Sequence, residues 1–226
     1  RYTQPALYVV NALMYRARVD EGQPAPAFVA GHSLGEYNAL LAAGVFDFVT
    51  GLRLVKRRGE IMSEVSGGGM AAVIGLEPTR IQEVLDSTEP GRRIDVANFN
   101  SFDQTVIAGP KDDLAAVQPQ FEAAGVRAYI PLNVSAPFHS RYMREAQSQF
   151  ADFLHDVPLA PPSIPVISNV SAKPYEGDLV RQTLSEQIGN SVRWLESMLY
   201  LLGQPDPQFE EVGPGQVLTK LLAQIK

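Results

Sequence analysis

Residues 25–44 read APAFVAGHSLGEYNALLAAG, and this stretch contains the pattern around which the chain is organised. Its apolar run, residues 25–30, ends at Gly31 and predicts a short buried strand. The residues that follow favour a helix, and Gly44 is a suitable residue to end it. The stretch therefore predicts a strand, a tight turn and a helix, with Ser33 on the turn.

The five residues 31–35, Gly-His-Ser-Leu-Gly, fit the G-x-S-x-G pattern of a nucleophile elbow. In such an elbow a sharp turn holds the serine in a strained backbone conformation, and the flanking glycines leave out Cβ atoms that would clash. The hydroxyl then projects at a helix N-terminus, where backbone N–H groups can stabilise an oxyanion. The alternative is a tight turn with a capping serine. The predicted strand before the turn and helix after it favour a nucleophile at Ser33.

A serine nucleophile needs a base, and His139 is the best candidate. It lies in residues 134–140, Val-Ser-Ala-Pro-Phe-His-Ser, where a predicted inserted unit returns to the main body of the chain. Without a nucleophile at Ser33, the same histidine would be interpreted as a surface residue at a helix start. His32 adjoins the serine but is expected to point away from it, and His155 is expected to be solvated.

The fold class predicted from the whole chain is α/β. Between residues 68 and 134 the predicted order of elements is strand, helix, strand, strand, helix, strand, which is the ferredoxin-like βαββαβ unit. We expect residues 68–134 to form a small subdomain inserted into a larger α/β body with a parallel sheet, made of residues 1–67 and 135–226. The Ser-Gly-Gly-Gly run at 66–69 predicts a flexible hinge at the first junction.

The predicted elements have definite bounds. In the small unit we expect strands at 70–76, 93–98, 104–108 and 126–132, and helices at 78–86 and 111–124. In the body we expect strands at 25–30 and 166–169, and helices at 4–18, 34–43, 46–63, 140–155, 180–188 and 194–202. Because the small unit fills the interval between Ser33 and His139, where an α/β-hydrolase carries its triad acid, the order disfavours a hydrolase.

Composition argues against several classes of function. Of the 226 residues 45% are hydrophobic and 19% are charged, as in an ordinary globular protein. The net charge of -6 argues against a nucleic-acid partner, because phosphate binding needs a basic face. No apolar run approaches the ~20 residues that cross a bilayer, and residues 1–5 do not open a secretory signal. Without cysteine, and with three histidines not at ligand spacing, we expect a cytoplasmic protein with no disulfide and no metal site.

Three motifs in one order carry a resemblance to a known family: GHSLGEY at 31–37, APFHS at 136–140 and EVGPGQVL at 211–218. In these motifs the chain resembles the malonyl-CoA:acyl-carrier-protein transacylases of fatty-acid and polyketide synthesis, and the resemblance covers essentially the whole chain. It implies an α/β-hydrolase-like body with an inserted ferredoxin-like subdomain, in agreement with the pattern above. It also implies that no metal or redox cofactor is required.

The resemblance assigns roles to five residues. Ser33 is then the nucleophile and His139 the base. Arg58 would grip the malonyl carboxylate, because a guanidinium fork can donate two parallel hydrogen bonds and a lysine cannot. On composition alone the same arginine could be an exposed helix residue. Gln187 would accept the second ring N–H of the histidine on its backbone carbonyl, which replaces the missing triad acid, and Leu34 would donate its N–H to the oxyanion.

The resemblance also implies a set of substrate-binding residues, which are Arg58, Phe138, His32, Asn98, Asn100 and Met62. Phe138 bears on selectivity, because members with phenylalanine before the catalytic histidine are generally malonyl-selective, whereas serine there accompanies methylmalonyl. A phenyl ring beside the acyl α-carbon leaves little room for a branch. Since a single methyl usually discriminates by only ~1–3 kcal/mol, malonyl is expected as a preference.

One family feature is missing from these residues. The family has a Gly-Gln-Gly loop near its N-terminus, and the N–H of that glutamine forms the oxyanion hole together with the residue after the serine. Here the chain begins after such a loop, so we expect a fragment whose first strand lies elsewhere. Losing one oxyanion donor typically costs ~10²–10³ in rate, and these residues alone are therefore expected to be nearly inactive.

The expected reaction moves malonyl from malonyl-CoA through Ser33 to the phosphopantetheine thiol of an acyl carrier protein. One alternative is an acyl hydrolase on the same fold that clears carrier proteins, but it would have no use for a carboxylate clamp at Arg58. Another is a non-catalytic docking fragment. The motifs GEYNALLAAG at 35–44 and ISNVSAKPY at 167–175 look more like free-standing acyltransferases of polyketide synthases than like fatty-acid enzymes. Candidate contacts for an acidic carrier protein, or else solvated helix faces, are Lys56, Arg57, Arg141 and Arg144.

Overall fold

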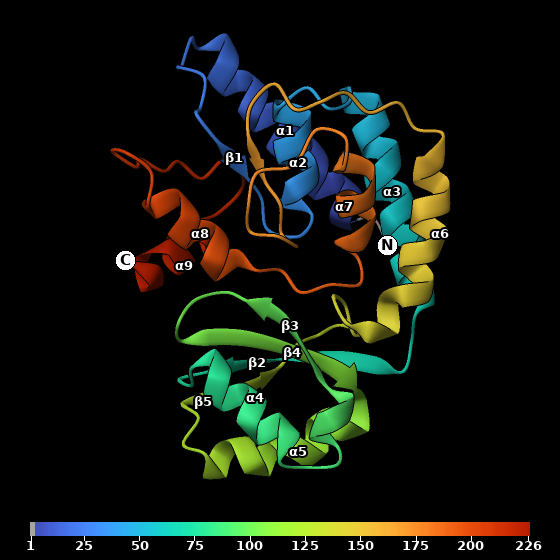
Figure 1. Ribbon diagram of the computed structural model, residues 1–226, viewed down its shortest axis with the longest axis vertical. Helices are drawn as coiled ribbons and strands as arrows, with labels where there is room; N and C mark the ends of the chain where they lie inside the picture. The colour runs from blue at the N-terminus through green and yellow to red at the C-terminus, as the bar shows by residue number, and fades with distance from the viewer. Residues whose placement is uncertain (1–2) are drawn as a thin grey trace.

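The computed structural model describes residues 3–226, and Arg1 and Tyr2 lie outside the described residues. Figure 1 shows a helix-rich body above a smaller unit built on a separate sheet. The helices of the body are α1 Thr3–Asp20, α2 Gly35–Ala42, α3 Phe48–Glu64, α6 Arg144–His155, α7 Val180–Glu186, α8 Trp194–Leu202 and α9 Val217–Ile225. None of the helices in residues 3–226 is long and apolar enough to cross a membrane.

The small unit is a four-stranded antiparallel sheet with the predicted βαββαβ order of elements. The sheet has the strand order β3-β4-β2-β5, so the first and third strands of the unit pair at its centre. Its strands are β2 Gly68–Ile74, β3 Asp95–Phe99, β4 Gln104–Pro110 and β5 Ala128–Pro131, and its helices are α4 Pro78–Asp86 and α5 Lys111–Ala123. The predicted limits of the two units, at 67/68 and 134/135, stay a prediction.

The two faces of this sheet have different neighbours because side chains alternate along each strand. On β2, Ala71 and Val73 pack with α4 and α5 in one core, while Met70 and Ala72 face the other way toward Phe138. In Figure 1, α4 and α5 cover the face of the sheet that points away from the body. The small unit therefore presents its second face to the region of His139.

The body contains a short parallel pair of strands that positions the serine motif. Strand β1, Val29–Ala30, pairs with β6, Val166–Ile167, in the register Val29↔Val166. The predicted strand at 25–30 is longer than the observed one, since Pro24 and Pro26 cannot donate to a sheet.

The predicted hinge at 66–69 is wrong for its last two glycines. Gly68 and Gly69 are buried in β2, where they pair with Pro110 and Gly109 of β4. A Cβ on Gly68 would lie 2.4 Å from Cδ of Pro137, so the absence of a side chain allows close approach and not flexibility.

Most helix predictions agree with the structure to within a few residues. The helices predicted at 78–86 and 194–202 have those bounds in α4 and α8. Helix α3 begins two residues later than predicted, because Asp47 caps it by accepting the Thr50 N–H at 2.7 Å. The helix predicted from 140 starts as a 3₁₀ turn, Arg141–Met143, before α6.

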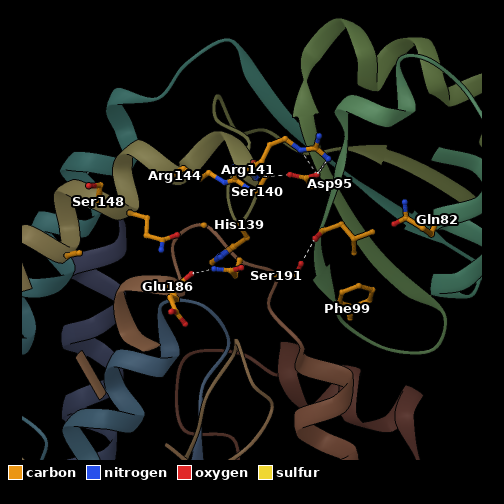
Figure 2. A pocket seen from close by; sticks show the side chains of 15 residues that line it. Gln82, Asp95, Phe99, His139, Ser140, Arg141, Arg144, Ser148, Glu186 and Ser191 are labelled. Atoms are coloured by element: carbon orange, nitrogen blue, oxygen red, sulfur yellow. Dashed lines mark hydrogen bonds and ion pairs between the residues drawn. The ribbon is translucent and has the colours of Figure 1, made fainter. Parts of the chain in front are cut away.

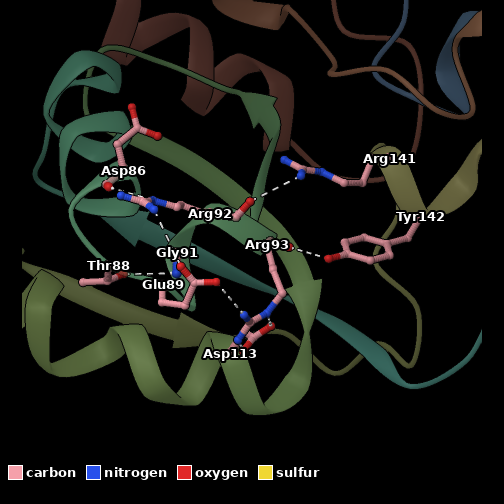
Figure 3. Close-up of polar contacts among 9 residues, drawn as sticks. All are labelled: Asp86, Thr88, Glu89, Gly91, Arg92, Arg93, Asp113, Arg141 and Tyr142. Carbon is pink, nitrogen blue, oxygen red and sulfur yellow. Dashed lines mark hydrogen bonds and ion pairs between the residues drawn. The ribbon is translucent and has the colours of Figure 1, made fainter.

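Three contacts join the small unit to the body beside His139. Figure 3 shows Tyr142, whose hydroxyl donates to the backbone carbonyl of Arg93 at 2.7 Å, and Arg141, which reaches the same turn. The Arg141 guanidinium also pairs with Asp95, whose second oxygen accepts the Arg141 backbone N–H at 2.7 Å. Farther along, the Val192 N–H donates to the Ala97 carbonyl at 2.8 Å, and the Val192 carbonyl accepts from the Phe99 N–H at 2.9 Å, both on the free edge of β3.

Candidate active site

Ser33 stands on the predicted turn between β1 and α2. Its φ of 50° lies in the left-handed region, which residues with side chains adopt only when their surroundings hold them there. A Cβ on Gly31 would lie 2.0 Å from the carbonyl carbon of Gly35, so only glycine fits where the helix turns back over the strand. A Cβ on Gly35 would meet nothing within 4 Å, and the expectation that both flanking glycines prevent a clash is therefore wrong for Gly35.

The structure brings Ser33, His139 and Gln187 into one hydrogen-bonded row. Ser33 Oγ lies 2.8 Å from His139 Nε2, and His139 Nδ1 lies 2.9 Å from the backbone carbonyl oxygen of Gln187. A carbonyl oxygen can only accept, so Nδ1 carries the proton and Nε2 is left with its lone pair toward the serine. The ring is thus oriented by a carbonyl, at the position where a triad acid would otherwise stand.

The surroundings of His139 keep its imidazole neutral. The residue is 4% exposed, and burial lowers its pKa to about 3, with the nearby Arg58 guanidinium acting in the same direction. A neutral imidazole at physiological pH can take a proton from Ser33 Oγ.

Arg58 of α3 is buried at 1% exposure and reaches the serine directly. Its Nη2 donates to Ser33 Oγ at 3.0 Å and to Gln187 Oε1 at 3.2 Å, and its Nη1 donates to Gln4 Oε1 at 2.7 Å. The guanidinium also lies over the ring of Tyr37, 5.6 Å from its centroid. These partners are neutral, and Nε meets no acceptor among the described residues, so the guanidinium keeps an unused donor and has no hydrogen-bonded carboxylate partner there.

Two amide side chains hold the Ser33 peptide groups from opposite sides. The Ser33 N–H donates to Asn169 Oδ1 at 2.7 Å, and the Ser33 carbonyl accepts from Gln187 Nε2 at 2.6 Å. Both amide residues also donate to the Glu36 carboxylate, which is fully buried in the first turn of α2. Sequence reasoning missed Glu36 and Asn169; the one available signal was a carboxylate beside the motif, at the start of a largely apolar helix.

His32, Asn98 and Asn100 form a cluster beside the serine. His32 Nε2 lies 2.8 Å from Asn100 Oδ1 and 3.3 Å from Asn98 Nδ2, and its ring lies against Trp194 with centroids 5.6 Å apart. Burial lowers the pKa of His32. As expected, this histidine turns away from Ser33, and it connects the body to the end of β3.

The remaining predicted site residues lie around this centre. Leu34 has an N–H with no acceptor among the residues that the structure describes, as an oxyanion donor requires. Phe138 is half-buried and packs against both the body core and the inner face of the small sheet. Met62 is 2% exposed in the body core, one helical turn after Arg58, and does not line the cleft described next.

A cleft of about 1170 Å³ opens between the body and the small unit and reaches His139 (Figure 2). Its lining residues are Gln82, Asp95, Val96, Phe99, His139, Ser140, Arg141, Arg144, Gln147, Ser148, Ala151, Glu186, Gly189, Asn190 and Ser191. Of the four basic residues predicted to contact a carrier protein, Arg141 and Arg144 line this cleft, whereas Lys56 and Arg57 lie near Glu60 of their own helix. No group of side chains suited to hold a metal ion occurs among residues 3–226.

The chain is similar to several known proteins. It is 54% identical over 226 residues to the polyketide biosynthesis protein PksE of Bacillus subtilis, covering 100% of this chain and 29% of PksE. It is 52% identical to the polyketide biosynthesis malonyl CoA-acyl carrier protein transacylase PksC of the same organism, covering 100% of this chain and 78% of PksC. The solved complex of a type II polyketide-synthase acyl-carrier protein with its malonyl-transacylase superposes with a TM-score of 0.95 at 38% identity, covering 99% of this chain and 74% of that chain.

The match to a family extends over most of the sequence. The chain spans about a third of PksE and about three quarters of PksC, so the shared part is one unit that also occurs in longer proteins. The profile of the acyl transferase domain matches residues 1–201, which include the serine, the histidine, the arginine and the amides described above. On this match and on the 52% identity to PksC, the chain belongs to the acyl transferase domain family.

Proposed function

We propose that this chain transfers malonyl from malonyl-CoA, through an ester on Ser33, to the phosphopantetheine thiol of an acyl carrier protein. The observation that carries the proposal is that Ser33 Oγ lies 2.8 Å from the base His139 and 3.0 Å from the buried cation of Arg58. The names of PksC and of the superposed complex support malonyl and a carrier protein as partners. Those of PksE and PksC support polyketide biosynthesis as the pathway.

The first half of the reaction loads the serine. Ser33 Oγ attacks the thioester carbonyl while its proton passes to His139 Nε2, and the Gln187 carbonyl, bonded to Nδ1, stabilises the imidazolium. The N–H of Leu34 donates to the oxyanion, and the Ser33 N–H is already engaged by Asn169. The carbon–sulfur bond breaks, and the leaving thiolate of CoA takes the proton from His139.

The second half reverses these steps on a different thiol. His139 takes the proton from the carrier's phosphopantetheine thiol, the thiolate attacks the malonyl ester, and the carbon–oxygen bond to Ser33 breaks. Oγ recovers the proton from the imidazolium, so that the enzyme returns to its starting state. The second oxyanion donor, the N–H of a glutamine expected to lie outside these residues, stays a prediction.

Arg58 is the proposed contact of the malonyl carboxylate. Substrate binding would exchange neutral amide partners such as Gln4 Oε1 for a carboxylate, and charge-assisted hydrogen bonds are roughly twice as strong as neutral ones. Phe138, beside the histidine and packed on both cores, would limit branching at the α-carbon, which makes malonyl the preferred acyl group.

The cleft is the proposed approach for the carrier protein. It holds Arg144, an exposed cation without a carboxylate partner among residues 3–226, which suits an acidic carrier. The reaction needs no metal and no redox cofactor in this proposal. A cytoplasmic location belongs to the same proposal and is in keeping with a cysteine-free sequence.

The test is intact-mass analysis of the protein incubated with malonyl-CoA, with and without an acyl carrier protein. We expect a malonyl adduct that forms slowly, because one oxyanion donor is expected to lie outside these residues. Ser33→Ala should abolish the adduct, and the malonyl group should move to the carrier when it is added. Release of free malonate in place of transfer would indicate an acyl hydrolase, and no adduct at all would indicate a docking fragment.

The companion variant is Arg58→Ala, with acetyl-CoA as the comparison substrate. We expect malonyl loading to fall by about 100-fold while acetyl loading changes far less, since acetyl has no carboxylate to lose. If malonyl loading is unchanged, the carboxylate assignment of Arg58 is wrong.

A further inference from the structure

Glu36 is a buried carboxylate that takes no part in the bond-making steps proposed above. It lies three residues after the nucleophile, in the first turn of α2, and its side chain has no exposed surface. A carboxylate at that place has a favourable interaction with the helix N-terminus, yet complete burial costs more than this interaction returns. A buried charge of this kind needs specific partners.

Three donors converge on the two oxygens of Glu36. Oε1 accepts from the Tyr175 hydroxyl at 2.6 Å and from the Asn169 backbone N–H at 3.0 Å. Oε2 accepts from Gln187 Nε2 at 2.7 Å. All three groups can donate, so the contacts suit the ionised carboxylate.

Two of these three partners are the residues that hold the Ser33 peptide. Asn169 follows β6 and Gln187 follows α7, and they lie 136 and 154 residues from Ser33 in the sequence. One carboxylate therefore holds both residues that bind the Ser33 peptide, Asn169 through its backbone N–H and Gln187 through its side-chain Nε2.

The orientation of the Gln187 amide depends on the same carboxylate. Its Nε2 is directed to Glu36 and to the Ser33 carbonyl, while its Oε1 accepts from Arg58. Without an acceptor at Glu36, the Gln187 amide would lose one of its three hydrogen bonds and keep those to the Ser33 carbonyl and to Arg58, so its orientation would be less strictly fixed.

We infer that Glu36 is a positioning residue, whose carboxylate orients Asn169 and Gln187 so that they hold Ser33 in its left-handed conformation with Oγ directed at His139. The inference goes one step deeper than the proposed function and takes from it only that Ser33 is the nucleophile. It does not depend on malonyl, on coenzyme A or on the carrier protein.

The test variant is Glu36→Gln, which keeps the shape of the side chain and replaces one oxygen by an NH₂ group. That group would face another donor, either Gln187 Nε2 or the pair of Tyr175 and Asn169. The matched control is Glu145→Gln, the same exchange at an exposed position of α6.

The readout is the labelling rate of Ser33 by a fluorophosphonate, measured per folded protein by mass spectrometry. In this reaction Oγ bonds to phosphorus, fluoride leaves, and His139 takes the serine proton, so the rate reports the nucleophile without any acyl substrate. We expect Glu36→Gln to label about 100-fold more slowly than the unchanged protein, because small misplacements of reacting groups have effects of that size. The control should label at the normal rate.

Circular dichroism of the same samples separates positioning from unfolding. A labelling rate of Glu36→Gln within about threefold of the unchanged protein overturns the inference, and so does a loss that the unfolded fraction fully accounts for. If Glu36→Gln does not fold, Glu36→Asp keeps the charge but shortens its reach, and it must still label at least about tenfold more slowly. Normal labelling without malonyl loading in the unchanged protein would contradict the proposed function and leave this inference standing.

Discussion

Besides its bond to Glu36, Gln187 has contacts with three other residues of the centre. Its carbonyl accepts from His139 Nδ1, its Nε2 donates to the Ser33 carbonyl, and its Oε1 accepts from Arg58. A single residue at the end of α7 thus sets the histidine tautomer, supports the strained serine and fixes one side of the guanidinium. Substitution at Gln187 would remove its side-chain contacts to Ser33, Arg58 and Glu36 together but leave the backbone carbonyl that binds His139, so single-residue effects here are non-additive.

The pKa of His139 makes a pH-dependent contribution to stability. The imidazole has a folded pKa of about 3 against 6.5 when unfolded, so the unfolded chain binds the extra proton between these values. The contribution is therefore complete above pH 6.5 and is lost as the pH falls toward 3. Between the two pKa values, each pH unit changes the free energy of unfolding by ~1.4 kcal/mol. Lowering the pH from neutral to ~4 should therefore remove roughly 3 kcal/mol of the contribution of His139.

Chemical denaturation of the unchanged protein and of His139→Gln across this range measures the difference. The comparison with a variant is needed because Glu36 acts in the opposite direction. Burial raises the pKa of Glu36 from 4.5 to about 7, so its contribution falls as the pH rises through that interval and offsets that of the histidine. A free-energy difference between the two proteins that does not change with pH would contradict the assigned burial of His139.

The residues of the centre differed in how far the sequence could predict them. Ser33 was marked by a local motif and His139 by its place where the inserted unit returns to the body, and the family resemblance then directed attention to Arg58 and Gln187. Nothing local distinguishes a buried carboxylate such as Glu36 from a solvated one on a helix. Its role arises only when Asn169 and Gln187 come to it from distant parts of the chain.

At the scale of elements, the close approach of β1 and α2 is the feature on which the serine geometry rests. Helix α2 turns back so sharply that the backbone of Gly35 occupies the place of a Cβ on Gly31. The backbone contact between Gly31 and Gly35 therefore sets the shape of the turn, and this shape sets the direction of the Ser33 side chain.

Gly31→Ala is expected to displace the start of α2 and lower stability by ~1–3 kcal/mol, as overpacked sites do. Labelling of Ser33 by a fluorophosphonate should fall by about 100-fold in the same variant. Gly35→Ala is the matched control, since its Cβ meets no atom within 4 Å. The melting temperature and the Ser33 labelling rate are measured for both variants. If the two variants have equal values, the backbone contact at Gly31 does not determine the serine geometry.

The elements themselves were predictable where the signal is local. Proline at its start marked the helix α4, whose predicted bounds are those observed. Gly68 was misinterpreted because the reason for it lies in Pro137, and a Cβ on Gly69 would meet Lys111 and Leu114; only the folded chain brings these residues near. Tertiary contact of this kind leaves no mark in a short stretch of sequence.

At the scale of the molecule, the pair of Arg141 and Asp95 connects the body to the small unit two residues after His139. The pair is partly exposed, so the ionic attraction itself is worth little. Its position is more important, because Asp95 also accepts the Arg141 backbone N–H at 2.7 Å and so fixes the chain that carries the histidine.

Asp95→Asn should therefore change stability by less than about 1 kcal/mol and still slow the loading of Ser33 several-fold. Arg80→Gln is the control, because it removes an exposed pair with Glu83 inside α4, remote from His139. The measurements are the melting temperature and the single-turnover rate of Ser33 loading, for both Asp95→Asn and Arg80→Gln. Loading equal to that of the control would show that the connection at Asp95 has no influence on the histidine.

Val192 has a further consequence for the way this chain could be rebuilt. Besides its two covalent junctions and the contacts of Arg141 and Tyr142, the small unit is attached to the body by Val192, which bonds along the edge of β3 that β4 leaves free. In a recombinant chimera that exchanges only residues 68–134, the edge of β3 would no longer meet the segment around Val192 with which it pairs here. Unpaired strand edges promote aggregation. A chimera made between relatives should therefore exchange the segment around Val192 together with residues 68–134.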